Sequence, residues 1–482
     1  MVWDPAFESA FHPKVVAIVG ISAKASLNSP GGTRFLNTYQ KMGFAGKIYL
    51  VNVNATEILG YKAYPSVSAI PEPVDLVIIT APAKAIPEIL EDCIAAKAKN
   101  VHLFTAGFEE TGVEEAKELG KRVREIALRG GIRMLGPNCM GLYVPEGHIG
   151  YMHVPPLKSG PVSYVFQSGG HSDWFSQHGP NYGIYFSKGI SYGNGYVLDS
   201  PDFLEYLASD PETKIICMYL EGVRDGQRLL KLVRETNLQK PIIIWKGGLT
   251  EAGSKAVSSH TGSLVGQSAI WQALFAQTGA VQVSSPEEMA ETTMTFLYVK
   301  KPAGKRVGVI GMGGGVSVYA ADACGREGLE LPSLSQSTRD ELNKFIPEAG
   351  GSTKNPVDCG AVFVDVSLLV REMDLVAADP SIDIVILMPH LNLARNIGPE
   401  QVDKLVNYMT DFALNNRYNK PVVIVFHSFI NEDWENELSA KLKIELPQKG
   451  VAVYNTLSGA ARALAGFCRY HRTREDFTRV NS

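Results

Sequence analysis

The chain lacks any cysteine pair spaced for a metal site or a disulfide framework, and it has no excess of positive charge. Its cysteines are scattered without a C-x-x-C motif, at Cys93, Cys139, Cys217, Cys324, Cys359 and Cys468. Such usage is typical of a protein in the reducing cytoplasm. The formal net charge is −4, whereas a nucleic-acid-binding protein normally carries a basic patch. We therefore expect a cytoplasmic protein with no bound metal and no nucleic-acid partner.

Long apolar runs and complete nucleotide-binding signatures are also missing. The longest apolar runs, such as residues 74–80 and 421–426, are too short to cross a membrane, and residues 1–14 lack the order of a secretory signal. There is no Walker A sequence, so any ATP site is expected on another chain. The glycine fingerprint of NAD(P)-dependent dehydrogenases is incomplete, and Asn52 and Asn54 stand where such an enzyme has an acidic residue.

What the sequence does contain is one unit that occurs three times. A β-rich run that ends in a glycine turn and opens a helix lies at residues 15–22, 161–170 and 306–315. Buried-type runs alternate with amphipathic segments after each of them, as in the helical pattern at 114–130. The 482 residues predict an α/β chain of about three doubly wound parallel-sheet domains, 1–150, 151–300 and 301–482. The polar tail at 471–482 is expected to be loose.

The three glycine turns are candidate anion sites, because open parallel sheets bind ligands at the carboxyl ends of their strands. Backbone N–H groups at a helix start would face the anion, and glycine leaves room for it. The residues are Gly20 and Ser22 with Lys24, then Ser168, Gly169 and Gly170, then Gly313, Gly314 and Gly315. A tight turn that the fold itself requires explains the first and third equally well. The second is not the nucleophile elbow of hydrolases, since no glycine precedes the serine by two residues.

Two titratable residues predict chemistry at these turns. His260 lies in a segment of small hydroxyl and glycine residues, interpreted as a loop that a phosphate can approach, with no metal-ligating neighbours in sequence. Glu221 directly follows a buried-type strand. A carboxylate there can hold one ring nitrogen of a histidine and leave the other free to attack phosphorus. Either residue alone is also typical of a solvated loop. Cys139, in another turn, is either a reactive thiol or a small filler beside tight backbone.

In these residues the chain resembles the alpha subunit of ADP-forming acyl-CoA synthetases of the acetate–CoA ligase type, relatives of succinyl-CoA synthetase. The resemblance covers nearly the whole chain and is carried, in order, by TAGFEETG, LGPNCMGL, VFQSGG, YLEGVRDG, KGGLTEAGSKAVSSHTGSLVG, VIGMGGGVSV and NPVD. It implies a Rossmann-like coenzyme-A-binding domain followed by two flavodoxin-like ligase domains, the first of which carries a phosphohistidine.

The resemblance also implies a reaction and its residues. Acid, coenzyme A and ATP would give acyl-CoA, ADP and phosphate through phospho-His260, with Glu221 in support and the two later glycine turns around the phosphate. An ATP-grasp beta subunit would bring ATP and Mg²⁺ in a hetero-oligomer, which the family suggests is a heterotetramer. Coenzyme A would contact Gly20, Ser22, Lys24, Asn54, Pro82, Thr105 and Gly107. A non-catalytic coenzyme-A-binding regulator is the alternative, although it has no use for His260 and Glu221 together.

Two departures from the family pattern stand out. The family usually reads V-N-P-K where this chain has Val51 to Asn54, which puts one coenzyme A phosphate contact in doubt. Residues 171–182 replace a regular apolar helix and include Gly179 and Pro180, which interrupt it. The segment is rich in aromatic and histidine residues: His171, Trp174, Phe175, His178 and Tyr182. It either shapes a bulky or aromatic acyl pocket or has drifted within a helix that packs against the partner.

Overall fold

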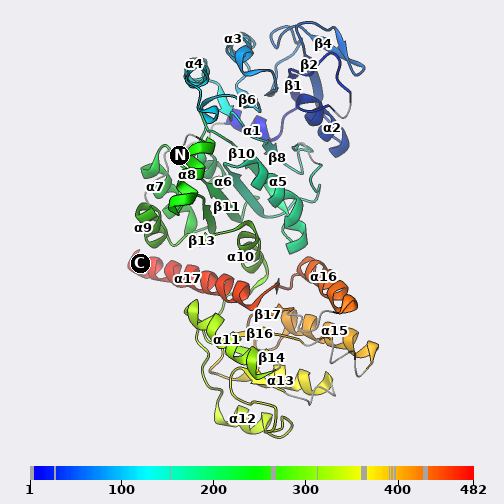
Figure 1. Ribbon diagram of the computed structural model, residues 1–482, viewed down its shortest axis with the longest axis vertical. Coiled ribbons are helices and arrows are strands. Elements are labelled where there is room, and N and C mark those ends of the chain that lie inside the picture. The colour runs from blue at the N-terminus through cyan, green and yellow to red at the C-terminus, as the bar shows by residue number, and fades with distance from the viewer. Residues whose placement is uncertain are drawn as a thin grey trace. The chain divides into compact units, whose positions relative to one another are not determined.

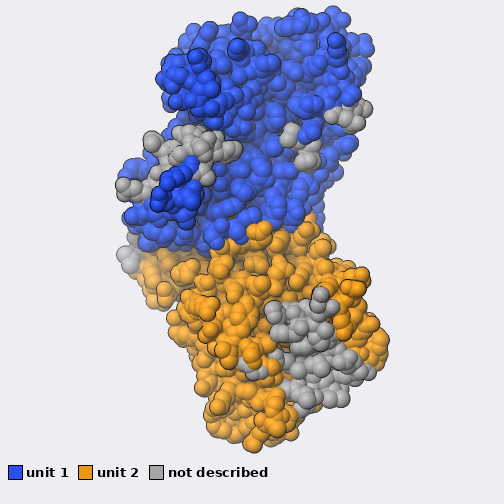
Figure 2. Space-filling view, in the orientation of Figure 1, with its two compact units in different colours: residues 1–178, 185–286 blue, residues 179–184, 287–482 orange. Residues whose placement is uncertain are grey.

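The computed structural model describes residues 5–26, 29–151, 154–261, 268–311, 313–359, 366–389, 391, 395, 398–426 and 432–481. The chain divides into two compact units (Figure 2). The first comprises residues 1–178 and 185–286, and the second comprises residues 179–184 and 287–482. Figure 1 labels many of the elements of each unit.

The first sheet of the first unit runs in the order β3-β4-β2-β1-β5-β6-β7 and is parallel except for the β3–β4 pair. Its central strands β1 and β5 are buried along their whole length, as expected of a parallel sheet covered on both faces. The strands are β1 Val15–Val19, β2 Lys47–Val51, β3 Glu57–Ile58, β4 Tyr61–Tyr64, β5 Leu76–Ile79, β6 Asn100–Leu103 and β7 Arg133–Leu135. The helices are α1 Pro5–Phe11, α2 Gly32–Met42, α3 Ile86–Ala95 and α4 Glu114–Arg129, with 3-10 turns η1 Ala83–Ala85 and η2 Glu109–Thr111.

The second sheet of this unit runs in the order β13-β12-β11-β9-β10-β8, with only β8 antiparallel to its neighbour among the described strands. The strands are β8 Gly141–Tyr143, β9 Val162–Phe166, β10 Phe186–Ser191, β11 Ile215–Leu220, β12 Ile242–Lys246 and β13 Val281–Val283. The helices are α5 Gly169–His178, α6 Ser200–Ser209, α7 Gly226–Asn237, α8 Glu251–Thr261 and α9 Ser268–Thr278.

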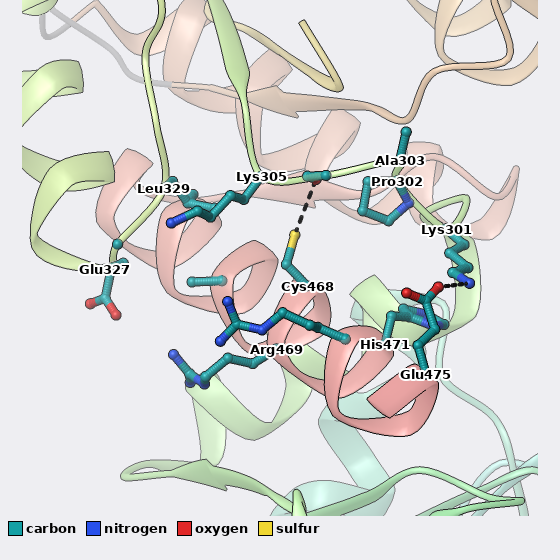
Figure 3. A pocket seen from close by; sticks show the side chains of 14 residues that line it. Lys301, Pro302, Ala303, Lys305, Glu327, Leu329, Cys468, Arg469, His471 and Glu475 are labelled. Atoms are coloured by element: carbon teal, nitrogen blue, oxygen red, sulfur yellow. Dashed lines mark hydrogen bonds and ion pairs between the residues drawn. The ribbon is translucent and has the colours of Figure 1, made fainter. Parts of the chain in front are cut away.

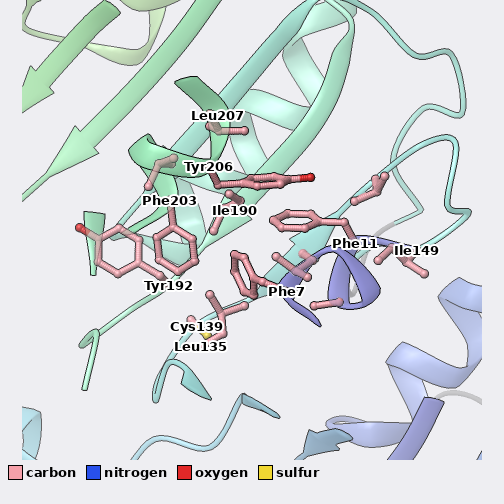
Figure 4. Packing of buried hydrophobic residues seen from close by; sticks show 14 of the residues in the cluster. Phe7, Phe11, Leu135, Cys139, Ile149, Ile190, Tyr192, Phe203, Tyr206 and Leu207 are labelled. Atoms are coloured by element: carbon pink, nitrogen blue, oxygen red, sulfur yellow. The ribbon is translucent and has the colours of Figure 1, made fainter. Parts of the chain in front are cut away.

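One hydrophobic core runs through the parts of the first unit that carry the two sheets (Figure 4). Phe7 and Phe11 of α1 pack on α6, where the rings of Phe11 and Tyr206 are stacked with centroids 4.4 Å apart. Cys139 is buried in the same core, and burial raises the pKa of its thiol far above the usual range. A thiol held neutral in this way is a small apolar filler, which favours that alternative over a reactive cysteine.

The second unit contains the third sheet, in the order β15-β14-β16-β17-β18, all parallel. Its strands are β14 Val307–Gly311, β15 Val357–Asp358, β16 Ile384–Leu387, β17 Val422–Val425 and β18 Val453–Tyr454. Its helices are η3 Gly179–Tyr182, α10 Pro286–Tyr298, α11 Gly314–Arg326, α12 Gln336–Leu342, α13 Val366–Ala378, α15 Pro399–Asn415, α16 Asp433–Gln448 and α17 Leu457–Asn481.

These sheets confirm the predicted α/β class with three parallel-dominated, doubly wound sheets. The domain limits at 150 and 300 stay a prediction. The expectation of a loose tail at residues 471–482 was wrong, since residues 471–481 continue α17. They contain no glycine or proline that would break a helix, and Glu475 pairs with Lys301. No helix of the described residues is long and apolar enough to span a membrane.

Candidate functional site

Two of the predicted site segments of the first unit, the turn after β9 and Glu221, lie at the carboxyl edge of the second sheet. β12, β11 and β9 are neighbours, so the residues that follow them meet there. Gln167 follows β9 and Glu221 follows β11. The side-chain Oε1 of Gln167 accepts hydrogen bonds from the backbone N–H of Glu221 (2.8 Å) and of Gly222 (3.1 Å). Gln167 therefore joins the two strand ends, a role that the sequence did not reveal.

The second glycine turn forms the start of α5, as predicted. Ser168 caps the helix, because its Oγ accepts a hydrogen bond from the N–H of His171 at 3.3 Å. Gly169 and Gly170 occupy the first turn, where backbone N–H groups have no acceptor within the helix. Gly170 is exposed, and a Cβ on it would meet nothing within 4 Å. An anion can therefore approach these N–H groups, which the helix dipole also favours.

Glu221 is a buried carboxyl with one oxygen in use and one to spare. The residue is only 5% exposed. Its Oε1 accepts a hydrogen bond from the Tyr219 hydroxyl at 3.0 Å, while Oε2 is buried and has no hydrogen-bond partner among the described residues. Burial and then Glu221 raise the pKa of Tyr219 above its usual range, so the phenol stays a donor. A buried oxygen without a partner is costly, and its presence indicates a donor still to be added.

Lys246, the last residue of β12, lies beside Glu221 and was missed by the sequence analysis. Its ammonium donates to the backbone oxygen of Glu221 at 2.9 Å and to that of Gly247. Burial lowers the pKa of Lys246 to about 8, although the carboxyl of Glu221 acts in the opposite direction. The one available signal was a lysine immediately before the glycine pair at the end of a buried strand. Such a cation, close to a candidate phosphate site, adds positive charge where an anion would bind.

An aromatic cluster adjoins the start of α5. His171 of α5, Tyr219 of β11 and Trp245 of β12 contact one another, with ring centroids 4.5 to 4.7 Å apart. Tyr219 is buried, while His171 and Trp245 are half-buried. The predicted interruption after α5 is confirmed, since the chain continues from Gly179 as η3. Of the residues singled out in this segment, only His171 belongs to the cluster.

The backbone of His260 lies in the last turn of α8, and its side chain is outside the described part of the chain. The sequence pattern indicated a loop, and that interpretation was wrong. Thr250 caps the start of the helix, because its Oγ1 accepts a hydrogen bond from the N–H of Gly253 at 3.0 Å. Val257, within α8, is buried. The cap and the buried face outweigh the low helix propensity of the serine and glycine residues. α8 follows β12 directly and contacts η2.

The residues expected to contact coenzyme A follow four adjacent strands of the first sheet. Gly20 comes after β1, Asn54 after β2, Pro82 after β5 and Thr105 after β6, and these strands are neighbours in the order β2-β1-β5-β6. Gly20 has φ +99°, and a Cβ there would lie 2.6 Å from the backbone nitrogen of Ala81. Only glycine permits this close approach of two strand ends.

Three of these contacts differ in detail from the sequence-based picture. Gly20, Ser22 and Lys24 were placed at a helix start, but α2 begins only at Gly32, so they lie in the connecting loop. The N–H of Gly107 already donates to Glu110 Oε1 at 2.6 Å. The backbone N–H of Asn54 donates to Asn52 Oδ1 at 2.8 Å. The side-chain Nδ2 of Asn52 in turn donates to the backbone oxygen of Ile21. Asn52 thus fastens two loops together.

The third glycine turn lies in the second unit and has the predicted form. β14 ends at Gly311 and α11 begins at Gly314, with Gly313 as the N-cap at φ +92°, a conformation that favours glycine. Asn355 is structural, since its amide donates to the Val307 oxygen at 2.7 Å and to the Pro332 oxygen at 3.0 Å. Met312, within this turn, lies outside the described residues.

Comparisons with known proteins identify two domain families in this chain. A coenzyme-A-binding domain family matches residues 14–145 and a succinyl-CoA ligase-like flavodoxin domain family matches residues 159–296. The acetate–CoA ligase [ADP-forming] II subunit alpha of Pyrococcus furiosus is 35% identical over 457 residues, 94% of this chain and 95% of that one. The chain belongs to the ADP-forming acetate–CoA ligase family.

Other members of the family differ in length or have a solved structure. Acetate–CoA ligase [ADP-forming] I of Archaeoglobus fulgidus is 37% identical over 385 residues, which are 79% of this chain and 54% of that protein. This chain thus spans about half of some relatives and nearly all of others. An acetyl-coenzyme A synthetase 1 of Candidatus Korarchaeum cryptofilum, solved with phosphate and ADP, superposes with a TM-score of 0.80 at 28% identity, covering 99% of both chains.

Proposed function

We propose that this chain is the alpha component of an acyl-CoA synthetase that forms ADP, and that its reaction passes through phospho-His260. The observation that carries the proposal is the spare, buried Oε2 of Glu221. It lies at the same sheet edge as the start of α5 and as β12, from whose end the His260 helix α8 follows. A carboxyl that accepts the N–H of an imidazole would fix its tautomer and complete its own hydrogen bonds.

The proposed reaction has three displacements. A neutral ring nitrogen of His260 attacks the terminal phosphorus of ATP, and the bond to the ADP oxygen breaks. A carboxylate oxygen of the acid then attacks the phosphorus, the P–N bond breaks, and an acyl phosphate forms. Finally the coenzyme A sulfur attacks the acyl carbon, phosphate leaves, and the thiol proton is released. Each step is chiefly a matter of positioning and charge stabilisation.

The residues of this chain have distinct roles in the proposal. The N–H groups of Gly169 and Gly170 and the ammonium of Lys246 would stabilise the transferred phosphoryl group. The third glycine turn would stabilise the phosphoryl group at a second position of the histidine, through Gly313, Gly314 and Gly315. Coenzyme A would lie at the carboxyl edge of the first sheet and be held by Gly20, Ser22, Lys24, Asn54, Pro82, Thr105 and Gly107. Of these, Gly107 offers no free N–H while Glu110 occupies it.

ATP and Mg²⁺ would reach His260 through a partner with an ATP-grasp fold. The sequence contains no Walker A motif, and the Pyrococcus furiosus relative is named as a subunit alpha. We therefore propose a hetero-oligomer with a beta subunit, a heterotetramer in the family's usual form. Mg²⁺ would neutralise the phosphate charges during transfer from the nucleotide.

The decisive experiment runs the reaction backwards without nucleotide. The purified chain is incubated with labelled phosphate, Mg²⁺ and a panel of aliphatic and aromatic acyl-CoAs, and acid-labile label on the protein is measured. We expect label on the wild-type chain and on a His12→Ala control, whose exposed histidine lines a hollow with residues 209–212, before the start of β11. We expect none on His260→Ala. Label that persists in His260→Ala would refute the relay. A chain that binds coenzyme A but is never labelled, even with a beta subunit present, would be a regulator instead.

For the acid, we propose a planar or aromatic carboxylate placed against the half-buried rings of His171 and Trp245. Offset stacking on such a cluster is worth about 0.5–1.5 kcal/mol beyond the area buried. Trp245→Leu should therefore lower kcat/KM for an aromatic acyl-CoA about tenfold relative to acetyl-CoA. Trp174→Leu is the matched control, because Trp174 stacks on His178 at 4.6 Å outside the cluster. Equal losses for both acyl classes would show that the cluster is only structural.

A further inference from the structure

A cavity of about 510 Å³ lies within the second unit, apart from every residue assigned above (Figure 3). One wall is formed by residues 301–305 and by the turn at 327–329, and the other is one face of α17. Its volume falls within the range of about 300–1,000 Å³ that is usual for small-molecule sites. The cavity therefore has the size of a ligand site and is not a packing defect.

The charges around this cavity leave two cations uncompensated. Lys301 pairs with Glu475 at 2.5 Å, Lys305 with Glu330 at 3.0 Å, and Glu327 with Arg462 at 3.5 Å. Two arginines of α17, Arg469 and Arg472, also line the cavity. Neither guanidinium has a hydrogen bond or an ion pair with any described residue. The lining thus presents two positive charges that nothing in the described chain neutralises.

The two arginines are placed to act together on one anion. They are three residues apart on α17 and both are exposed, so they share a face of the helix. A guanidinium presents its N–H groups as a fork that matches phosphate or carboxylate oxygens in bidentate geometry. His471 adds no charge near neutral pH, because burial and then the nearby Lys301 and Arg474 lower its pKa to about 4. A phosphate with two negative charges matches the pair of arginines.

The rest of the lining is apolar and offers a place for the body of such a ligand. Leu329 and Ala465 are buried and line the cavity beside Pro302 and Ala303, as Figure 3 shows for Leu329, Pro302 and Ala303. Burial of an organic group against this surface would stabilise binding beyond the phosphate contact alone. Inorganic phosphate would use the arginines but leave most of the cavity empty.

We propose that this cavity binds a phosphorylated small molecule of nucleotide size, its phosphate on Arg469 and Arg472 and its apolar body against Leu329 and Ala465. The ligand would bridge residues 301–305 and α17, which lie far apart in sequence. Because it binds only the folded unit, it would stabilise that unit by mass action. The site is distinct from the proposed acyl-transfer residues and independent of them.

A footprinting experiment on the full chain tests the site directly. Lys301 and Lys305 are acetylated in the presence of ADP, coenzyme A, inorganic phosphate or adenosine, and each lysine is followed by mass spectrometry of its peptide. We expect saturable protection of both lysines by ADP or coenzyme A, weaker protection by inorganic phosphate and none by adenosine. Lys404 of α15, which is exposed and outside the cavity, should react at the same rate throughout. Equal protection by adenosine, or none by any phosphate compound, would overturn the proposal.

Variants separate this site from nonspecific charge effects and from the proposed enzyme reaction. R469Q/R472Q should weaken protection at least tenfold, since it removes both guanidinium groups that would donate charge-assisted hydrogen bonds to the phosphate. K404Q/K449Q changes the net charge by the same amount at two exposed lysines and should bind as the wild type does. H260A should also keep full protection. Protection by an acidic peptide alone would mean a protein partner and would refute the small-molecule site, as would undiminished protection in R469Q/R472Q.

Discussion

At the residue scale, the candidate site depends on buried polar groups that are supported by their neighbours. Glu221 receives one hydrogen bond from Tyr219, and its backbone is held by Gln167 and Lys246. These contacts fix the position of the carboxyl before any substrate arrives. Preorganised groups of this kind cost no rearrangement at the moment of reaction, which is where much of an enzyme's rate advantage arises.

Replacing Glu221 by glutamine tests whether the spare oxygen matters. Glu221→Gln keeps the shape and the Tyr219 contact but loses the carboxylate, so we expect the labelling rate of His260 to fall about 10- to 100-fold. Stability should change little, since a buried carboxyl with an unpartnered oxygen is replaced by a neutral group. The measurement is single-turnover labelling at saturating phosphate, with thermal unfolding alongside. An unchanged rate would show that Glu221 does not act on the histidine.

Lys246 gives a pH-dependent prediction. In the folded chain its pKa is lowered to about 8 by burial, whereas an unfolded lysine keeps its proton to about pH 10.4. Between these values the unfolded chain binds more protons, so the folding stability contributed by this residue rises with pH. Below pH 8 Lys246 is protonated in both states, so the buried ammonium destabilises the folded chain by its full desolvation free energy. Denaturant unfolding of the first unit should therefore show wild type gaining stability relative to Lys246→Met from pH 8 to 10. A difference that is constant over this range would contradict the prediction.

At the element scale, the glycines at helix starts combine backbone access with a low helix propensity. In α11 a further glycine lies near the end of the helix, where no ligand is proposed. Gly315 lies in the first turn of α11 and Gly325 near its end, and a Cβ on either would meet nothing within 4 Å. This helix therefore allows a comparison between Gly315, which is proposed to lie against the phosphate, and Gly325, for which no role is proposed.

Alanine at these two positions should separate anion binding from stability. Both Gly315→Ala and Gly325→Ala should keep or raise stability, by at most about 1 kcal/mol, because alanine is the better helix former. Only Gly315→Ala places a methyl group where the phosphate is proposed to approach. We expect it alone to slow phosphate transfer from acyl phosphate to His260, measured with the beta subunit present. Equal rates in both variants would favour the tight-turn explanation of residues 313–315.

At the scale of the whole molecule, the two compact units have cores of their own. In the first unit, α1 packs its phenylalanines on α6. This contact makes residues from the start of the chain part of the core that also supports the second sheet. Loss of that contact should therefore be felt by the first unit as a whole.

Phe11→Ala tests this division by calorimetry. Phe11 is fully buried, and removal of such a side chain typically costs about 3–5 kcal/mol. We expect two thermal transitions in the wild type, one for each unit. In Phe11→Ala the midpoint temperature of the first unit should fall, while that of the second unit stays unchanged. Leu157, which is 48% exposed, provides the control, since Leu157→Ala should move neither transition by much. A joint shift of both transitions would show that the units unfold as one.

The order of strands and helices could be predicted from the sequence, because buried parallel strands are short apolar runs and each glycine turn marks a strand end. That pattern gave β9, Ser168 and α5, and likewise β14, Gly313 and α11. It failed at His260, where small residues indicated a loop although the Thr250 cap and buried Val257 form a helix. It failed also for the start of α2, because the helix begins only at Gly32, after Pro30 and Gly31, and not at the glycine turn that ends β1.

The sequence by itself thus determined the α/β class, the family and the candidates His260 and Glu221, because these depend on local patterns and short motifs. Only the tertiary structure decided which strand ends are neighbours. Gln167, Tyr219 and Lys246 surround Glu221 because β9, β11 and β12 are adjacent in one sheet, although they are far apart in the chain. The cavity beside Arg469 likewise exists only where α17 packs against residues 301–305. Contacts between distant segments depend on the packing of the whole sheet, which no local pattern encodes.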